Sequence, residues 1–326
     1  MSILRRKLKA WVCERYGELE LRQAEKPELV DDGVLVRVHA TSINRADWYG
    51  FLGAPLIARA MIGLRKPRSR FIGGDFAGVA EAVGKDVEGI RPGDEVFGAR
   101  TGAFADYVCA RRAVARKPAD IGFEEAAAVG IAATTALQGL RDKGGVQPGQ
   151  KVLINGASGG VGTFAVQIAK TLGAGHVTAV CSTRNVEQAR ALGADEVIDY
   201  TREDFTRRPE RFDLIFDNAG THSWRECCRA LTPTGTLVLV GAQMKSRLFS
   251  PLGHIAGVLL ASRFSKRKAV FFIAKINRLD LELLGEWIEA GKVRPVIEQR
   301  YEFDRLEDAL RRMGEGHARA KLVVTV

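Results

Sequence analysis

Residues 152–170, VLINGASGGVGTFAVQIAK, constrain the fold more than any other part of the sequence. An apolar run, a burst of small residues and an amphipathic pattern follow one another, which predicts a strand, a tight turn and a helix. At a helix N-terminus the backbone N–H groups and the helix dipole favour negative charge, and small side chains let a pyrophosphate approach them. We therefore interpret the turn as a nucleotide-binding segment formed by Gly156, Ala157, Ser158, Gly159, Gly160, Val161 and Gly162.

The glycine spacing in this turn almost matches the dinucleotide fingerprint G-x-G-x-x-G. Gly159 and Gly162 take its second and third places, and the third glycine lets the helix pack close to the sheet. Ala157 stands at the first place, so the match requires a turn that tolerates a methyl group. The alternative is a tight strand–helix turn that binds no ligand.

The patterns on either side of the turn predict the fold class. After residue 150, continuously apolar strands alternate with helices, as expected for a doubly wound parallel α/β sheet with helices on both faces. From residue 9 to about 110, short strand patterns between Gly, Pro and Asp turns predict a mostly antiparallel, barrel-like domain. Residues 123–144, FEEAAAVGIAATTALQGLRDKG, predict a helix that stops at Gly144–Gly145.

The end of the strand after the turn indicates which nucleotide is bound. An NAD site usually has Asp or Glu there, about 20 residues past the turn, to hold the ribose 2′-hydroxyl. This chain has no carboxylate at that place and offers Ser182, Thr183 and Arg184, which suit a 2′-phosphate. We therefore predict NADPH (NADP⁺) as the cofactor. The alternative is that these residues only start the next helix, with Thr183 as its cap.

The charge balance raises a nucleic-acid alternative. The net charge is +10, but the basic residues form separate clusters at Arg5–Lys9, Arg65–Arg70, Arg207–Arg211 and Arg263–Lys268. Neither an aromatic-interleaved RNA motif nor a zinc-finger spacing accompanies them. A generally positive field that attracts anionic ligands explains the charge more simply, and we expect no nucleic-acid partner.

The cysteine spacing and the apolar runs indicate the cellular compartment in which the protein is expected. The five cysteines are scattered, which argues against a disulfide framework or a zinc knuckle. The longest apolar run, around Ile255–Ala261, is far shorter than the roughly 20 residues that span a bilayer, and the N-terminal residues do not resemble a secretory signal. A cytoplasmic location is the expectation. Peripheral membrane association through residues 251–268, an apolar stretch followed by basic residues, is the alternative to a buried segment.

The order of motifs along the chain resembles the medium-chain dehydrogenase/reductase superfamily. TSINRADWYG, GGDFAGVAEAVG, RPGDEVFGA and GASGGVG are similar to its zinc-independent branch, the quinone oxidoreductase-like enzymes. The resemblance covers essentially the whole chain. It implies a GroES-like substrate domain formed by residues 1–123 and 279–326, with a Rossmann NADP-binding domain, residues 124–278, inserted between them.

The residues themselves indicate whether the chain has a catalytic zinc site, because such a site needs three protein ligands from Cys, His and Asp or Glu. Zinc-dependent relatives place a cysteine in the stretch that is Ser42–Asp47 here, and a His-Glu pair where Gly74-Asp75 stand. None of the five histidines has a ligand-like spacing, and GDEVFGARTGAFADYV replaces the four-cysteine lobe. We therefore expect a metal-free site and an acceptor that is already electrophilic.

The resemblance also implies catalytic residues near the nicotinamide. It places Asn44 and Asp47 by the substrate cleft, Asn44 as a hydrogen-bond donor and Asp47 as a residue that orders its loop. Tyr49, the nearby phenol, is a candidate proton donor or ring-stacking wall, and the alternatives are an ordinary half-buried tyrosine and a proton from solvent.

Further cofactor contacts follow from the same resemblance. Thr135 matches a threonine that faces the nicotinamide ribose, with Thr134 as its competitor, and Tyr200 matches an adenosine contact. Other candidates end strands at the carboxyl edge of the sheet, where ligands bind: Asn218, Gly220, Gly241 and Ala242. Lys321 stands where the family often has the lysine of a Gly-Lys pair, and Phe271 and Phe272 are candidates for core packing or for a wall of the nicotinamide site.

These features predict a zinc-independent, NADPH-dependent oxidoreductase that transfers hydride to a quinone or an α,β-unsaturated carbonyl. The alternatives are an enoyl or alkenal double-bond reductase, and an NADPH-binding regulatory protein with little turnover. The resemblance further implies a homodimer, for which the apolar strand AVFFIA, residues 269–274, is a plausible edge.

Overall fold

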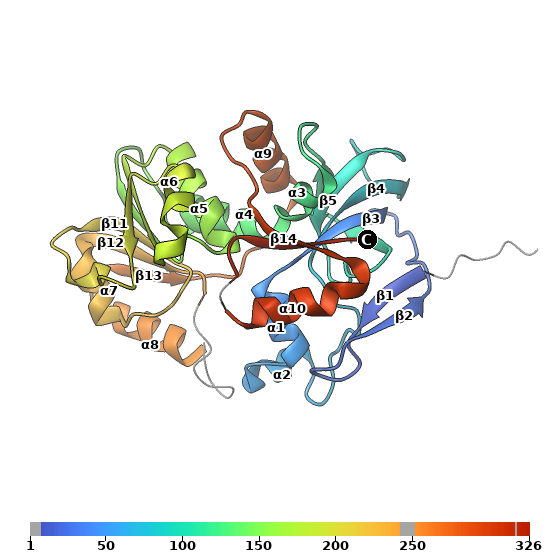
Figure 1. The fold of residues 1–326 in the computed structure, drawn as a ribbon, viewed down its shortest axis with the longest axis horizontal. Helices are drawn as coiled ribbons and strands as arrows, with labels where there is room; N and C mark the ends of the chain where they lie inside the picture. Colours follow the sequence, from blue (N-terminus) through green and yellow to red (C-terminus); the bar gives the residue numbers. More distant parts are fainter. Residues whose placement is uncertain (1–7, 242–251, 317) are drawn as a thin grey trace, which may run out of the picture. The chain divides into compact units, whose positions relative to one another are not determined.

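The computed structural model describes residues 8–241, 252–316 and 318–326 (Figure 1). The chain divides into two compact units. Unit 1 comprises Met1–Ile131, Ile276–Glu289 and Ile297–Val326, and unit 2 comprises Ala132–Lys275 and Ala290–Val296. Unit 2 therefore interrupts unit 1 in the sequence. The assignment of these units as the substrate and nucleotide domains, with boundaries at 123/124 and 278/279, stays a prediction.

Unit 2 contains a six-stranded, wholly parallel sheet. Its strands are β8 (Lys151–Asn155), β9 (His176–Cys181), β10 (Glu196–Asp199), β11 (Phe212–Asp217), β12 (Leu231–Leu239) and β13 (Lys268–Phe271). Their spatial order, β10-β9-β8-β11-β12-β13, is the 3-2-1-4-5-6 order of dinucleotide-binding sheets. The order reverses between β8 and β11, and such a switch point is where ligands bind, beyond the carboxyl ends of the strands.

Helices cover both faces of this sheet. They are α5 (Gly160–Thr171), α6 (Val186–Ala191), α7 (Trp224–Ala230) and α8 (Leu252–Ser262), with short turns η2 (Gly139–Lys143), η3 (Thr183–Asn185) and η4 (Phe205–Arg207). Figure 1 shows α5 and α6 on one side of the sheet and α7 and α8 on the other. Consecutive strand residues such as Val152, Leu153 and Ile154 are completely buried, which requires cover on both faces.

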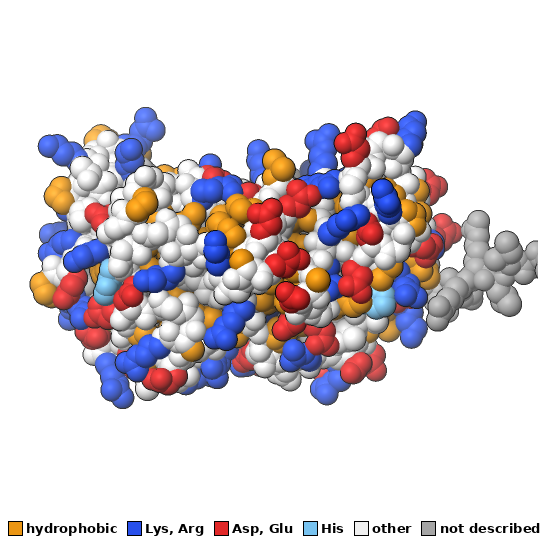
Figure 2. All heavy atoms as spheres, turned by 90° about the horizontal axis from the view of Figure 1, so that it is seen from above, with side chains coloured by type: hydrophobic (Ala, Val, Ile, Leu, Met, Phe, Trp, Pro, Cys, Tyr) orange, Lys and Arg blue, Asp and Glu red, His pale blue; other side chains and the backbone are white. Residues whose placement is uncertain are grey.

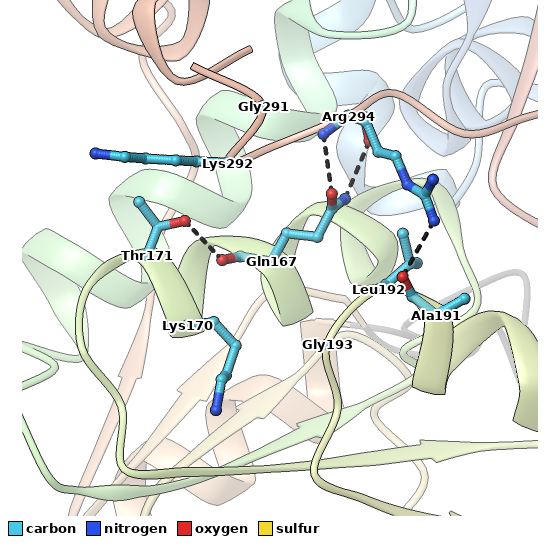
Figure 3. Close-up of a pocket in the computed structure, with 9 residues that line it drawn as sticks. All are labelled: Gln167, Lys170, Thr171, Ala191, Leu192, Gly193, Gly291, Lys292 and Arg294. Atoms are coloured by element: carbon cyan, nitrogen blue, oxygen red, sulfur yellow. Dashed lines mark hydrogen bonds between the residues drawn. The ribbon is translucent and has the colours of Figure 1, made fainter. Parts of the chain in front are cut away.

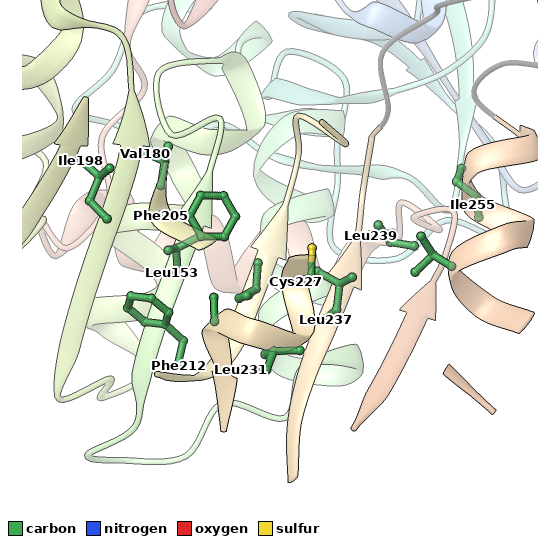
Figure 4. Close-up of a cluster of buried hydrophobic side chains, with 13 residues drawn as sticks. Leu153, Val180, Ile198, Phe205, Phe212, Cys227, Leu231, Leu237, Leu239 and Ile255 are labelled. Atoms are coloured by element: carbon green, nitrogen blue, oxygen red, sulfur yellow. The ribbon is translucent and has the colours of Figure 1, made fainter. Parts of the chain in front are cut away.

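The core on the α7–α8 side is shown in Figure 4. Leu153, Val180 and Leu237 of the sheet pack with Cys227 of α7 and Ile255 of α8. The neighbour of Cys227, Cys228, is only half-buried, because adjacent residues of a helix point to different faces. All five cysteines are free thiols.

Unit 1 is built mainly from antiparallel strands. They are β1 (Leu8–Val12), β2 (Glu20–Ala24), β3 (Gly33–Ile43), β4 (Asp75–Val83), β5 (Glu95–Ala99), β6 (Tyr107–Arg111), β7 (Val114–Arg116), β14 (Ile297–Glu302) and β15 (Lys321–Thr325). A seven-stranded sheet has the order β14-β15-β3-β4-β5-β7, with β6 also paired to β3, and β1 and β2 form a separate pair. Among the described strands of this unit, β14 and β15 form the one parallel pair.

The helical segments of unit 1 are α1 (Arg45–Leu52), η1 (Leu56–Ala58), α2 (Arg59–Ile62), α3 (Phe123–Ala127), α9 (Arg278–Glu289), η5 (Phe303–Arg305) and α10 (Leu306–Gly314). Phe51 of α1 and Leu310 of α10 pack into one apolar cluster with Leu322 of β15. This cluster holds the start of α1 beside the end of β3 and the start of β15, which positions the polar residues described below. The predicted fold class, a doubly wound parallel sheet with a mostly antiparallel second part, is confirmed.

The prediction of one continuous helix over residues 123–144 is wrong, because the structure interrupts it. The structure has α3, then α4 (Gly130–Gln138), then the π-helical turn η2. The Ile131 N–H donates to the Asp75 Oδ1 at 2.7 Å, and a Cβ on Gly130 would lie 2.5 Å from that same oxygen. The Asp75 carboxylate, from a distant part of the chain, therefore caps the start of α4, and local sequence patterns do not carry that information.

The apolar segment near residue 255 forms the eleven-residue helix α8. None of the helices in the described residues is both long and apolar enough to cross a membrane. On the face shown in Figure 2, Lys and Arg side chains are interspersed with Asp and Glu. The cluster Arg207–Arg211 is similarly balanced, since Arg208 pairs with Glu196, Glu203 and Glu210.

Candidate functional site

The small-residue turn of unit 2 joins the end of β8 to the start of α5. Gly156 adopts a φ of +82°, which favours glycine, and its N–H donates to the Val180 carbonyl at 3.1 Å. Ala157 is 1 % exposed, lies outside the positive-φ region and donates its N–H to the same carbonyl. The methyl group therefore points into the core, which explains how an alanine replaces the first glycine of the fingerprint.

Gly159 and Gly162 have different surroundings in this turn. A Cβ on Gly162 would lie 2.1 Å from the Gly156 carbonyl oxygen, so the first turn of α5 is packed directly on the backbone of the turn. A Cβ on Gly159 would meet nothing closer than the Asn218 Nδ2, at 3.5 Å. Gly159 is the N-cap of α5, at φ −80°, and it is partly exposed. The first N–H groups of α5 have no partner within the helix and adjoin the place beside Gly159 that carries no side chain.

The loop after β11 closes the other side of this space. Asp217 is buried at the end of the strand, and its Oδ1 accepts hydrogen bonds from Asn155 Nδ2 (2.8 Å), Gly220 N (2.8 Å) and Ala219 N (3.1 Å). Burial raises the pKa of Asp217, and these donors oppose the shift. Gly241 is packed against Asn218, since a Cβ there would lie 2.7 Å from the Asn218 carbonyl oxygen.

At the switch point the structure thus gathers Gly156, Gly159, Asn218 and Gly241, all of which the sequence singled out. It also reveals Asp217 and Asn155, which the sequence reasoning missed. Gly220 has a positive φ of 60° and turns the loop back. Ala242 lies outside the described residues.

The end of β9 carries the residues predicted to meet the adenosine ribose. Ser182 is the N-cap of η3, so Thr183 is the first residue of that turn and not its cap. Thr183 and Arg184 are exposed, and Tyr200, which follows β10, is 59 % exposed. The Thr183 hydroxyl donates to the Asp199 Oδ2 at 2.5 Å. A carboxylate therefore reaches this place from the neighbouring strand.

The remaining candidates of unit 2 differ in accessibility. Thr135 is half-buried on α4, whereas Thr134 is completely buried and its hydroxyl has no hydrogen-bond partner. Thr134 is therefore the poorer candidate for a ligand contact. Phe271 packs against the sheet core and Phe272 lies near Gly139, as expected for packing residues.

This arrangement fits the pyrophosphate of a dinucleotide. Gly159 leaves room for one methyl-sized group, in ordinary contact with the Asn218 Nδ2 and the Gly156 carbonyl oxygen, and the N-terminus of a twelve-residue helix adjoins this place. In that position the first N–H groups of α5 would hold the phosphates. The Asn218 amide borders the same space.

Unit 1 contains a buried polar network centred on Asp75. Its Oδ2 accepts hydrogen bonds from Ser42 Oγ (2.7 Å), Asn44 Nδ2 (2.8 Å) and Lys321 Nζ (3.2 Å). Lys321 also donates to the Asn44 Oδ1 at 2.7 Å. The side chains of Lys321 and Asp75 are 2 % and 0 % exposed. Asn44 is thus held at both ends of its amide, so the structure gives it a fixed place in the network.

Asp47 and Tyr49 lie in α1, just above this network. The Asp47 Oδ2 accepts the Asn44 N–H at 2.8 Å and thereby caps the helix. Its Oδ1 points toward Gly74, where a Cβ would lie 3.6 Å away. Removal from water raises the pKa of Asp47 to about 7, with a further contribution from the Asp75 charge, opposed by Asn44 and Lys321. Burial also raises the pKa of Tyr49.

The pKa of Asp47 predicts a pH dependence of stability. Between about pH 4 and pH 7 the folded chain holds a proton that the unfolded chain releases, so the free energy of unfolding should fall as pH rises through this window and level off above it. Comparison with Asp47→Asn by urea denaturation should show a pH-dependent difference on the order of 2 kcal/mol, less than the full shift would give because the Asp47 residue keeps some exposure to water. The exposed Asp120→Asn is the control, and an identical pH profile for wild type and Asp47→Asn would contradict the prediction.

The described residues contain no group of three or more His, Cys, Asp or Glu side chains that could hold a metal ion. Near Asn44 and Gly74, the carboxylate of Asp75 has both oxygens engaged by protein donors. The polar groups that meet at Asp75 are therefore the Asn44 amide, the Ser42 hydroxyl and the Lys321 ammonium, all of which donate to its carboxylate.

A pocket of about 610 Å³ lies elsewhere in unit 2 (Figure 3). It is lined by Gln167 and Thr171 of α5, by residues 191–193 and by Arg294. Gln167 and Arg294 face each other through two hydrogen bonds, and Arg294 Nη2 donates to the Ala191 carbonyl. The pocket adjoins the C-terminal half of α5 and the C-terminus of α6, and Lys170, Lys292 and Arg294 are in its lining. Its lining does not include the small-residue turn at the N-terminus of α5.

Comparisons with known proteins agree with this geometry. Residues 30–185 match the family model described as the alcohol dehydrogenase GroES-like domain, and residues 192–324 match the one described as zinc-binding dehydrogenase. The chain is 31% identical over 335 residues to 2-methylene-furan-3-one reductase of Solanum lycopersicum, covering 97% of this chain and 79% of the relative.

Two further similarities cover nearly the whole chain. The chloroplastic NADPH-dependent alkenal/one oxidoreductase of Arabidopsis thaliana is 30% identical over 341 residues, covering 98% of this chain and 80% of the relative. The structure of the quinone oxidoreductase from Coxiella burnetii superposes with a TM-score of 0.86 at 29% identity, covering 98% of this chain and 100% of that one.

Proposed function

We propose, from the premise that this chain belongs to the quinone oxidoreductase-like family of the medium-chain dehydrogenase/reductase superfamily, that it reduces small electrophilic acceptors with NADPH. It is an NAD(P)H-dependent oxidoreductase, as the sequence predicted. The proposal extends this to acceptors that are α,β-unsaturated carbonyls or quinones. Named relatives act on alkenals and a furanone, and a solved relative is a quinone oxidoreductase, which supports this acceptor class.

The observation that carries the proposal is the side-chain-free N-cap Gly159, which leads into α5 at the switch point of the parallel sheet. In the proposal the first N–H groups of α5 bind the pyrophosphate, and Asn218 borders it. When bound, the nicotinamide supplies a hydride. Thr135, Tyr200, Gly220 and Gly241 stay proposed cofactor contacts.

We assign the proton that accompanies the hydride to Asp47. The Asn44 amide is held by Asp75 and Lys321, whereas burial raises the pKa of the Asp47 carboxyl to about 7, so that it is partly protonated near neutral pH. The alkene gains hydride at one carbon and this proton at the other, and Asp47 regains a proton from solvent. Asp47→Asn should therefore lose turnover while it keeps NADPH affinity.

The proposal does not require zinc. A conjugated acceptor is electrophilic without a Lewis acid, so the proposed hydride transfer needs no metal ion to polarise it. The description 'zinc-binding dehydrogenase' belongs to the family model that matches residues 192–324, and we do not transfer it to this chain. The cysteine and the His-Glu pair of zinc-dependent enzymes are not reproduced at Ser42–Asp47 or Gly74-Asp75.

The experiment follows NADPH oxidation at its near-ultraviolet absorbance with a quinone, a simple enone and a simple aldehyde, with and without a zinc chelator. Turnover of the enone or quinone that the chelator leaves unchanged is the expected result. Tight NADPH binding without turnover of any acceptor would overturn the enzymatic proposal in favour of a binding protein.

NADPH preference is a further part of the proposal, supported by Arg184 beside the end of β9. Arg184→Ala should weaken NADPH binding on the order of tenfold and change NADH binding little, because the guanidinium would pair with a 2′-phosphate. Fluorescence titration of both cofactors measures this. Equal losses for both would reject the assignment.

The homodimer and the cytoplasmic location also remain proposals. β13 (Lys268–Phe271) pairs only with β12 in the described sheet, and Phe264 and Ile273 beside it are 88 % and 79 % exposed, which supports pairing of two edges. Light scattering at micromolar protein and cell fractionation test these two points.

A further inference from the structure

The end of β10 brings a carboxylate to the ribose end of the candidate nucleotide site. Asp199 is the last residue of β10 and lies in register with Cys181, the last residue of β9. Its Oδ2 accepts the Thr183 hydroxyl at 2.5 Å, and its Oδ1 accepts Thr201 N at 3.0 Å and Thr201 Oγ1 at 2.7 Å. Three donors, the Thr183 hydroxyl and the N–H and hydroxyl of Thr201, therefore hold this carboxylate in place.

These contacts determine what the end of β9 offers to a ligand. The Thr183 proton is committed to Asp199, so the Thr183 oxygen, which also lies 3.1 Å from the Thr201 Oγ1, is left as an acceptor. The hydrogen bond from Thr183 is the main cause of a lowered pKa for Asp199, so the carboxylate is ionised at neutral pH. Arg202, whose Nε lies 3.4 Å from Asp199 Oδ2, is a largely exposed partner and neutralises it only in part.

We propose that Asp199 is a cofactor-specificity residue, whose charge disfavours a 2′-phosphate and whose partner Thr183 accepts a hydrogen bond from a ribose 2′-hydroxyl. In dinucleotide-binding sheets the 2′ substituent lies at the end of the second strand, which is β9 here. The inference rests on the proposed function, because it requires the adenosine ribose to lie at this place.

The proposal predicts a balance of opposing charges at one subsite. Arg184 and Arg202 attract a 2′-phosphate, and Asp199 repels it, so NADPH preference is weaker than the arginines alone would give. Near a protein surface one unit charge changes the interaction with a phosphate a few ångströms away enough to alter affinity on the order of tenfold. The chain would then retain measurable affinity for NADH.

The experiment uses two ligands that differ by the 2′-phosphate alone, adenosine 2′,5′-bisphosphate and 5′-AMP, with NADPH and NADH as the complete pair. Calorimetric titration of wild type and Asp199→Asn gives the affinity of each ligand without any turnover. We expect Asp199→Asn to tighten the bisphosphate and NADPH about tenfold. Binding of 5′-AMP and NADH should change less than twofold.

Asp195→Asn is the matched control, because it makes the same substitution just before the opposite end of β10. It should leave the ratio of the two affinities unchanged. If Asp199→Asn melts well below wild type, Asp199→Ser replaces it, since a serine oxygen still accepts a hydrogen bond. Unchanged or weaker bisphosphate binding in the folded variant, or an equal change for both ligands, would overturn the inference. Failure of wild type to bind NADPH and NADH would instead reject the proposed function.

Discussion

Gly162→Ala should destabilise unit 2 and abolish NADPH binding together. The new Cβ would lie 2.1 Å from the Gly156 carbonyl oxygen and 2.8 Å from the Ala157 Cα. Both are backbone atoms, which cannot rotate aside as a side chain does, so α5 must move away from the turn. We expect a loss on the order of 3 kcal/mol in the free energy of unfolding. Urea denaturation and NADPH titration measure the two effects.

Gly159→Ala is the matched control in the same turn. Its Cβ would lie 3.5 Å from Asn218 Nδ2 and 3.7 Å from the Gly156 oxygen, and the φ of −80° suits alanine. The fold should therefore lose no more than about 1 kcal/mol, the usual effect of an alanine at an N-cap. NADPH affinity should still fall about tenfold, because the methyl group occupies the approach of the pyrophosphate.

The two variants separate folding from binding. If Gly159→Ala bound NADPH as tightly as wild type, the space beside Gly159 would not be the phosphate site. If Gly162→Ala kept wild-type stability, the close packing of α5 on the turn would not require a glycine. In either case the physical reason given for the fingerprint would be wrong.

The parallel sheet could be predicted from the sequence because burial on both faces leaves a local signature. Runs such as VLIN and FDLIF have no polar alternation, and helix patterns separate them at regular intervals. The tight turn at residues 156–162 could also be predicted, since only small residues fit there. What the sequence could not decide was whether Ala157 is tolerated, because that depends on the direction of its methyl group, which the structure shows to be inward.

The residues that the sequence reasoning missed depend on contacts between distant segments. Asp199 follows Ser182 by 17 residues and reaches Thr183 only because β10 and β9 are neighbours. One signal could have revealed it: β8, β10 and β11 each end in a polar residue, namely Asn155, Asp199 and Asp217. The carboxyl ends of parallel strands share one edge, so such residues should be examined together.

The network in unit 1 illustrates the same limit. Asp75 and Lys321 are separated by 246 residues, and each was considered only for its place in a motif. Their meeting depends on β15 pairing with β3, which then pairs with β4. The same Asp75 accepts a hydrogen bond from Ile131 at the start of α4, just after the point where the helix predicted over residues 123–144 is interrupted.

Lys321→Met should destabilise unit 1 on the order of 3–5 kcal/mol. The substitution keeps most of the apolar volume and removes the ammonium, which leaves the Asp75 charge buried with hydrogen-bond donors but without a counter-charge. It also removes the donor to the Asn44 Oδ1. An uncompensated charge in a dry interior costs more than the pair itself contributes, so the loss should exceed that of an ordinary buried methylene.

A double-mutant cycle tests this reasoning. Asp75→Asn alone leaves the Lys321 ammonium buried without its carboxylate, whereas Asp75→Asn combined with Lys321→Met leaves neither charge. The double variant should therefore be less destabilised than the sum of the two single variants by at least about 1 kcal/mol. Additive losses would mean that the two groups contribute separately, through packing and neutral hydrogen bonds. The buried ion pair would then not be what holds Asn44 beneath the start of α1.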